Sequence, residues 1–241
     1  MGIIVQKFGG TSVSNTERLL KVCEHIIKEY NNKKEMVVVV SAQGKTTDNL
    51  VKEEAEITKT ASSREHDVLL SIGEQITIAK LVMCLNKLGY EAISYTGWQV
   101  PIKTNNEYGN ADIIDINTEK IKEQLSKKKI VVVAGFQGIN EYGDITTLGR
   151  GGSDTTAVAL ASYLNAEKLI IYTDVDGVYS KDPNKNLDAV KYDQITYDKM
   201  IEMAENGAKV LHSKCVRMAK ENKVPILVKS TFEDGTGTLV Y

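Results

Sequence analysis

Short apolar runs rich in β-branched residues recur along the chain. Each is almost continuously apolar rather than alternating, which favours strands buried on both faces, as in a parallel sheet. The expected strands are Ile3–Phe8, Met36–Ser41, Ala92–Tyr95, Ile130–Phe136, Leu169–Thr173 and Ile226–Thr231.

Between these runs lie segments whose apolar residues recur every three or four positions, the pattern of amphipathic helices. Asn15 stands at the start of the first segment, where its side chain can cap a helix. Strands that alternate with helices predict an α/β fold with a mostly parallel sheet covered on both faces. The expected helices are Thr16–Tyr30, Ile72–Leu88, Asn117–Lys129, Asp154–Asn165, Met200–Glu205 and Val210–Lys220.

Length and composition are those of an ordinary globular protein. The 241 residues are 42% apolar and 26% charged, enough for one large domain or two lobes that share a core. Lys and Arg number 30 against 32 Asp and Glu, a net charge of −2. This balance provides no field for general binding to a phosphate backbone, so we expect no nucleic-acid partner.

The cysteines and the apolar runs bear on location. Cys23, Cys84 and Cys215 are far apart in sequence and form no C-x-x-C pair, so we expect small buried hydrophobic residues in a reducing compartment. No run reaches the roughly 18 apolar residues of a membrane span, and the start lacks the pattern of a signal peptide. A cytoplasmic location without membrane contact is the resulting prediction.

A glycine turn follows the first expected strand, in the segment Lys7–Ser14. Gly9 and Gly10 would let backbone N–H groups approach an anion, and Lys7 adds a full positive charge. The alternative is a tight turn with no ligand.

A second glycine-rich segment, Thr146–Asp154, places Arg150 among three glycines and opens a helix at Ser153 or Asp154. An Arg held in such a turn is a good bidentate partner for a carboxylate or a phosphate. Any lobe boundary is expected near Gly149–Gly152.

A third segment, Thr173–Pro183, follows a buried strand, at the end where open parallel sheets bind ligands. Its Asp174, Asp176 and Tyr179 indicate a nucleotide or metal site, with a solvated turn as the alternative. A calcium loop is excluded because position 185 is Lys rather than the required Glu.

Other candidate residues are more dispersed. The segment Ser41–Asp48 follows another strand and opens a helix at Asp48, and Glu74 lies in an otherwise apolar helix. Lys209 stands at an expected helix start, where a cation opposes the helix dipole, so we expect an anionic partner for it.

The three histidines give no catalytic pattern. His25 and His66 lie in segments that read as solvated helices, and His212 is remote from both in sequence. We therefore expect neither a histidine-dependent nucleophile nor a zinc site.

Taken together, these motifs resemble the aspartate kinases of the amino-acid kinase family. They occur in that family's order and cover nearly the whole chain, from Ile3 to Val240. The matching segments are Lys7–Ser14, Ser41–Asp48, Arg64–Glu74, Phe136–Gly138, Thr146–Asp154, Thr173–Pro183 and Gly207–His212.

The resemblance implies a three-layer αβα sandwich with a mostly parallel central sheet. Residues 1–150 would form the lobe that binds the amino acid, and residues 151–241 the lobe that binds the nucleotide. The implied reaction transfers a phosphoryl group from ATP to the side-chain carboxylate of L-aspartate, giving 4-phospho-L-aspartate, the first step towards lysine, threonine and methionine. Mg²⁺ would be carried by the ATP phosphates without a metal site of the protein.

The resemblance also assigns roles to residues of this chain. The catalytic residues would be Lys7, Asp154 and Lys209, with Asp154 holding the lysines beside the phosphates. The aspartate pocket would comprise Thr47, Glu74, Phe136, Arg150 and Ser153. The nucleotide would be bound by Lys7, Gly9, Gly10, Ser41, Thr173, Asp174, Tyr179 and Lys209, with Gly9 and Gly10 as backbone donors.

The chain departs from the family pattern at three places. Asn184 replaces an Arg that commonly follows Asp-Pro and helps to hold the ATP phosphates, and Ser213 replaces a Pro. Typical members continue past Val240 into regulatory ACT domains, which these 241 residues do not include. We therefore expect no inhibition by lysine or threonine within this chain, a homodimer, and regulation through a separate ACT-containing subunit if there is any.

Two alternatives stay open. One is a kinase of the same fold that acts on glutamate, carbamate or a nucleoside monophosphate. The other is a weakly active binding or regulatory subunit, which Asn184 and the absent ACT domains favour and which the intact Lys7, Arg150 and Asp154 disfavour.

Overall fold

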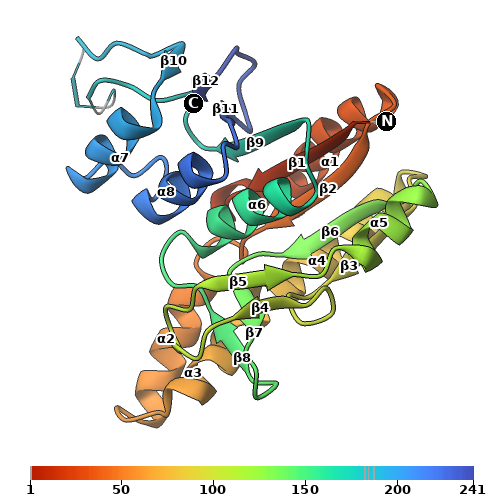
Figure 1. Ribbon diagram of the computed structural model, residues 1–241, viewed down its shortest axis with the longest axis vertical. Helices are drawn as coiled ribbons and strands as arrows, with labels where there is room; N and C mark the ends of the chain where they lie inside the picture. The colour runs from red at the N-terminus through yellow and green to blue at the C-terminus, as the bar shows by residue number, and fades with distance from the viewer. Residues whose placement is uncertain (1, 182, 184, 187) are drawn as a thin grey trace.

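A sheet of eight strands forms the centre of the computed structural model, which describes residues 2–181, 183, 185, 186 and 188–241 (Figure 1). The order across this sheet is β10-β12-β11-β9-β1-β2-β6-β3. The strands are β1 (Ile3–Phe8), β2 (Glu35–Val40), β3 (Ala92–Tyr95), β6 (Ile130–Ala134), β9 (Lys168–Thr173), β10 (Gln194–Ile195), β11 (Ile226–Ser230) and β12 (Thr238–Val240).

Every strand expected from the apolar runs is present, with ends that differ by two residues at most. These strands, β3, β6, β2, β1, β9 and β11, pair with one another in parallel. Only at the edge does β12 run antiparallel to β11. Lys7 lies opposite Val39 of β2 and Ile171 of β9, so the lysine stands at the carboxyl end of the central strand.

Helices cover both faces of the sheet, which confirms the predicted three-layer arrangement (Figure 1). On one face, α1 (Thr16–Asn31) and α4 (Ile72–Lys87) pack on Met36, Val38 and Val40 of β2. On the other face, α5 (Glu119–Ser126), α6 (Gly152–Tyr163), α7 (Tyr197–Glu205) and α8 (Ser213–Glu221) share a core with Val37 and Val39. Alternate residues of one continuous apolar run thus serve two cores.

A smaller four-stranded sheet and the helix Ser63–Leu70 escaped the sequence prediction, whereas the helix expected to open at Asp48 is present and begins at Thr46. The sheet has the order β5-β4-β7-β8 and lies at one end of the molecule with α2 and α3 (Figure 1). Its strands of three or four residues are too short for a clear apolar pattern. The elements are β4 (Ile102–Thr104), β5 (Ile113–Ile116), β7 (Gln137–Ile139), β8 (Ile145–Thr147), α2 (Thr46–Ile57) and α3 (Ser63–Leu70).

One helix begins where the sequence predicts, and another begins three residues later. Asn15 caps α1 as expected, since its side-chain oxygen accepts a hydrogen bond from the Arg18 N–H. The predicted helix start at Val210 is wrong, because α8 begins at Ser213. Lys209 therefore lies in the loop before α8, where it is exposed. Among the described residues it has no ion pair, so no side chain there supplies the anionic partner that was expected for it.

One helical stretch, Ser63–Lys87, is long and apolar enough to cross a membrane by length and composition alone. A core helix passes the same test, and this stretch divides at Ser71 into α3 and α4. Its Asp67 and Glu74 are buried carboxylates that accept hydrogen bonds from backbone N–H groups of other segments. Because α4 also packs on β2, β3 and β6, the stretch belongs to the core of this fold.

The prediction of a solvated His25 is wrong. Its ring nitrogen lies 2.8 Å from the Thr231 carbonyl oxygen, and its ring packs on Tyr172 with centroids 4.6 Å apart. Burial lowers the pKa of His25. Of the three free cysteines, Cys23 and Cys215 are buried as expected, and burial raises the pKa of the Cys23 thiol to about 12.

Two residues on α4 offer a test of this packing. Leu81 is fully buried, whereas Met83, on the opposite face of the helix, is 68% exposed. Leu81→Ala should lower the free energy of unfolding by about 2–5 kcal/mol, because it leaves a cavity between helix and sheet. Met83→Ala is the matched control and should change it by about 0.5 kcal/mol or less. Urea denaturation measures both; equal effects of the two variants would contradict the packing described.

Candidate active site

A cleft of about 660 Å³ opens at the carboxyl ends of β1 and β2, where the glycine-rich turn before α6 meets the first turn of α2. This is the end at which open parallel sheets bind ligands. The cleft brings together most of the predicted site residues: Lys7, Gly10, Ser41, Thr47, Glu74, Phe136, Arg150, Ser153 and Asp154.

Lys7 and Asp154 form a buried ion pair at the base of the cleft. The Lys7 Nζ lies 2.6 Å from the Asp154 Oδ1, and both side chains are about nine-tenths buried. The pair joins the central strand to the first turn of α6, which confirms the expectation that Asp154 holds Lys7. The resemblance implied that Asp154 also holds Lys209, but the two side chains are not paired in the structure.

The glycine turn after β1 is a close approach of two backbones. A Cβ on Gly10 would lie 2.7 Å from the Ala42 carbonyl oxygen, so only glycine fits there. Gly9 does not have the free backbone donor that was expected, because its N–H donates to the Tyr172 carbonyl oxygen at 3.3 Å. That bond joins the turn to the end of β9, so Gly9 shapes the turn and lines neither this cleft nor the second pocket described below.

Glu74 is a buried carboxylate without a full set of partners. Its Oε1 accepts a hydrogen bond from the Ala42 N–H at 2.9 Å, whereas its buried Oε2 has no partner among the described residues. Burial raises the pKa of Glu74 to about 8, although Lys7 acts in the opposite direction. A ligand cation at the cleft would compensate the unpaired oxygen.

The Arg150 turn depends on backbone conformations that favour glycine. Gly149 and Gly151 both have a φ of 72°, and a Cβ on Gly151 would lie 2.4 Å from the Cβ of His212. Arg150 itself is exposed and makes no ion pair within the part of the chain that the structure describes. Its guanidinium is therefore free to bind an anion in the cleft.

Phe136 also has a left-handed backbone, with a φ of 71°. Its N–H donates to the Thr156 Oγ1 at 3.1 Å, and its carbonyl oxygen accepts from the Leu148 N–H at 2.9 Å. These two bonds hold a conformation that is uncommon for a bulky residue. They also join the end of β6 to α6 and to the Arg150 turn.

The remaining predicted residues do not line the cleft. Tyr179 and Lys209 line a second pocket of about 540 Å³. The two hollows are neighbours along the chain, since Lys209 lines the pocket and His212 lines the cleft. Asp176 was a candidate for a nucleotide or metal site. Its carboxylate instead accepts hydrogen bonds from the Tyr179 hydroxyl at 2.8 Å and from the Lys191 ammonium at 2.9 Å.

Thr173 and Asp174 lie at the end of β9 and line neither hollow. The Thr173 Oγ1 donates to the Asp174 Oδ1 at 3.1 Å, so the two side chains are paired with each other. Asn184, the position that departs from the family pattern, lies outside the described residues.

Several cleft residues were not found from the sequence. His66, for which no role was expected, lines the cleft, with its Nδ1 2.5 Å from the Glu54 Oε2. His212 and Thr147 line it as well. Their places in the cleft depend on tertiary packing, which no local pattern of the sequence indicates.

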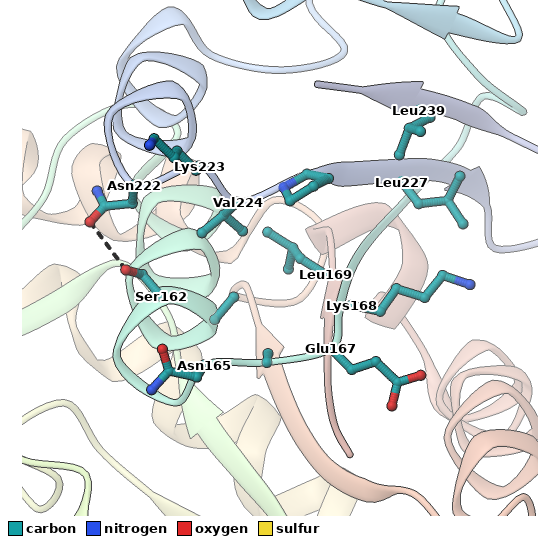
Figure 2. A pocket seen from close by; sticks show the side chains of 13 residues that line it. Ser162, Asn165, Glu167, Lys168, Leu169, Asn222, Lys223, Val224, Leu227 and Leu239 are labelled. Carbon is teal, nitrogen blue, oxygen red and sulfur yellow. Dashed lines mark hydrogen bonds between the residues drawn. The ribbon is translucent and has the colours of Figure 1, made fainter.

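Another cavity, of about 520 Å³, lies at the amino ends of β9 and β11. Figure 2 shows its lining, which includes Lys168, Leu169, Leu227 and the hydrogen-bonded pair Ser162 and Asn222. None of the predicted site residues line it, and it is at the opposite end of the strands from the cleft.

Within the described residues, no group of three or more His, Cys, Asp or Glu side chains is placed to hold a metal ion.

The model of the amino acid kinase family matches residues 2–230. The chain belongs to the amino acid kinase family. The resemblance seen in the sequence is thereby confirmed at the level of the family and its fold.

Curated relatives of this family member include the aspartokinase of Bacillus sp. (strain MGA3), 56% identical over 240 residues, and aspartokinase 2 of Bacillus subtilis (strain 168), 52% identical. Both matches cover 100% of this chain but only 58% and 59% of the relatives. The chain thus spans somewhat more than half the length of the aspartokinases it matches.

Solved structures agree with this family fold. The aspartate kinase from Synechocystis has a TM-score of 0.87 at 44% identity. The match covers 99% of this chain and 40% of the Synechocystis chain. E. coli aspartokinase III in complex with aspartate and ADP has a TM-score of 0.88 at 28% identity, with 99% and 64% covered. A uridylate kinase from Archaeoglobus fulgidus, at 22% identity and a TM-score of 0.67, shares the fold alone.

The raised pKa of Glu74 predicts a pH dependence of stability. Between about pH 4.5 and 8, the folded protein retains a proton that the unfolded chain has released, so the free energy of unfolding falls as the pH rises. Glu74→Gln has no proton to retain. In the ligand-free protein, its stability relative to wild type should therefore rise by about 1 kcal/mol per pH unit across this range.

Urea denaturation from pH 5 to pH 8 measures this difference. Glu53→Gln, at an exposed position of α2, is the control for a charge change without burial. A stability difference between Glu74→Gln and wild type that is the same at every pH would contradict a buried, proton-retaining Glu74.

Proposed function

We propose that this chain catalyses the transfer of the γ-phosphoryl group of ATP to the side-chain carboxylate of L-aspartate. The observation that carries the proposal is the set of charges in the cleft: the exposed Arg150, the unpaired Oε2 of the buried Glu74, and Lys7 held by Asp154. The names of the relatives, and the aspartate and ADP named with E. coli aspartokinase III, support the choice of substrates.

Recognition of an amino acid needs one cation and one anion. The guanidinium of Arg150 would bind the α-carboxylate through two parallel hydrogen bonds. The Oε2 of Glu74 would accept a hydrogen bond from the α-ammonium group, which would favour the ionised form of this carboxyl. Thr47, Phe136 and Ser153 line the same cleft and would complete the pocket.

The chemistry needs no general base. The side-chain carboxylate of aspartate, with an ordinary pKa of about 3.9, is already ionised at pH 7 and is the nucleophile. One carboxylate oxygen attacks the γ-phosphorus, the bond from that phosphorus to the β–γ bridging oxygen breaks, and ADP leaves with the electron pair. The products are 4-phospho-L-aspartate and ADP.

Catalysis would then consist of positioning and charge neutralisation. The ammonium of Lys7 would stabilise the charge that develops on the transferring phosphoryl group, and Ser41 and Gly10 would lie beside the phosphates. Tyr179 and Lys209 line the second pocket and, with Thr173 and Asp174, would bind the nucleotide. Mg²⁺ bound to the ATP phosphates would supply further neutralisation.

Assembly, location and regulation are further parts of the proposal. We place the chain in the cytoplasm as a homodimer, the most frequent assembly of soluble enzymes. Control by lysine or threonine would require an effector site with different affinities for two states, such as an ACT-containing subunit could provide.

A coupled assay of ADP release tests the proposal directly. Aspartate, glutamate, carbamate and uridine monophosphate are compared, with hydroxylamine present to trap an acyl phosphate as the hydroxamate. Of these four acceptors, we expect only aspartate to give both ADP and hydroxamate. Turnover of the monophosphate without hydroxamate would establish a nucleotide kinase instead, and binding of aspartate and ATP without turnover would establish a binding subunit.

Lys7→Ala tests the catalytic lysine. The variant should lower kcat by about 10²–10³-fold or more, the loss typical of a group that stabilises charge in the transition state. The KM for aspartate should change much less, because Arg150 and Glu74 are intact. A kcat close to that of wild type would remove Lys7 from catalysis.

Two further variants make this result interpretable. Lys7→Ala leaves the Asp154 carboxylate buried and unpaired, so the double variant Lys7→Ala/Asp154→Asn restores a neutral site and separates lost chemistry from lost stability. Lys34→Ala is the matched control, because it removes a lysine paired with Glu167 on the surface.

A further inference from the structure

Asp67 is a fully buried carboxylate to which the proposed reaction assigns no role. It lies on α3 and accepts hydrogen bonds from two other segments. The Thr147 N–H and hydroxyl donate to it at 2.8 and 2.7 Å, and the Gly109 N–H donates to both carboxylate oxygens at 2.9 and 3.1 Å. No Lys or Arg of the described residues is paired with it.

These bonds fix the segment that leads into the Arg150 turn. Thr147 is the last residue of β8, three residues before Arg150. Its N–H is held by Asp67 and its carbonyl oxygen accepts from the Ala111 N–H at 2.9 Å. Gly149 lies against the same loop, since a Cβ there would meet the Asn110 side-chain oxygen at 2.6 Å.

The turn is anchored from α8 as well. The Lys214 Nζ donates to the Ala111 carbonyl oxygen at 3.0 Å and lies 2.9 Å from the Asp112 carboxylate. Asp67 on one side and Lys214 on the other thus hold one short stretch of backbone. Arg150 itself has no such anchor, so its place depends on the backbone that carries it.

We propose that Asp67 is a positioning residue, which sets the Arg150 turn so that the guanidinium can bind the α-carboxylate of the amino-acid substrate. The inference rests on the proposed function for the identity of that substrate. The placement of the turn by Asp67 does not.

A carboxylate is required because every partner is a donor. Two backbone N–H groups and one hydroxyl converge on Asp67, and an ionised carboxylate offers acceptors only. In Asp67→Asn, one side-chain oxygen is replaced by an NH₂ group that faces these donors. The volume hardly changes, so the variant alters hydrogen bonding rather than packing.

Steady-state kinetics of Asp67→Asn tests the role. We expect the KM for aspartate to rise by about tenfold or more, while the KM for ATP stays within about twofold, because Tyr179 and Lys209 line a pocket that does not include Gly109 or Thr147. Asp144→Asn is the matched control. Asp144 lies in the turn between β7 and β8, and its carboxylate accepts hydrogen bonds from Arg64 and from the Tyr108 hydroxyl. This variant should leave both KM values within about twofold.

A double variant distinguishes positioning from general damage. In an Arg150→Ala background, Asp67→Asn should raise the KM for aspartate by less than about twofold, because the group that it positions is absent. A full tenfold effect in that background, or equal effects on the KM for aspartate and for ATP, would overturn the proposal.

Amide hydrogen exchange of the ligand-free protein tests placement without any substrate. The Leu148 and Ala111 amides are hydrogen-bonded to backbone carbonyls of this region and not to Asp67. In Asp67→Asn they should exchange at least about tenfold faster, while amides of β1 are unchanged. Unchanged exchange at Leu148 and Ala111 would overturn the proposal. Wild-type protein that fails to phosphorylate aspartate would refute the proposed function alone, and the exchange result would still decide the placement.

Discussion

The ion pair between Lys7 and Asp154 is the constraint on which the site depends. Two charges that are nearly buried remain ionised only when they are paired, so the lysine at the end of the central strand requires the carboxylate at the start of α6. This requirement fixes how α6 enters the fold, and with it the turn that carries Arg150. The ion pair thereby joins two segments of the cleft that are 147 residues apart in sequence, those of Lys7 and Asp154.

The sheet makes this convergence possible. Because its central strands are parallel, their carboxyl ends meet at one edge, and β1, β2 and β6 deliver Lys7, Ser41 and Phe136 to the same place. The cores on the two faces share one set of apolar runs, which leaves the strand ends free for polar residues. Two polar groups of the cleft have no partner among the described residues, Glu74 Oε2 and the Arg150 guanidinium, and they are complementary to an ammonium and a carboxylate.

The sequence predicted what depends on local pattern and missed what depends on tertiary contact. The strands, the Asn15 cap, and the glycine turns around Gly10 and Arg150 follow from side-chain spacing and from conformations that few residues adopt. The bond that occupies the Gly9 N–H, the packing of His25 and the burial of Asp67 depend on segments far away in the chain. No local pattern reports which donors will surround a buried carboxylate.

In the proposed reaction, a carboxylate oxygen of the substrate attacks phosphorus directly. Phosphorus-31 NMR of the reaction with ATP and L-aspartate labelled with oxygen-18 in its side-chain carboxylate tests this claim. We expect an acyl phosphate signal with the isotope shift of a labelled bridging oxygen. An acyl phosphate signal without this isotope shift would show that the attacking oxygen is not that of the aspartate side chain.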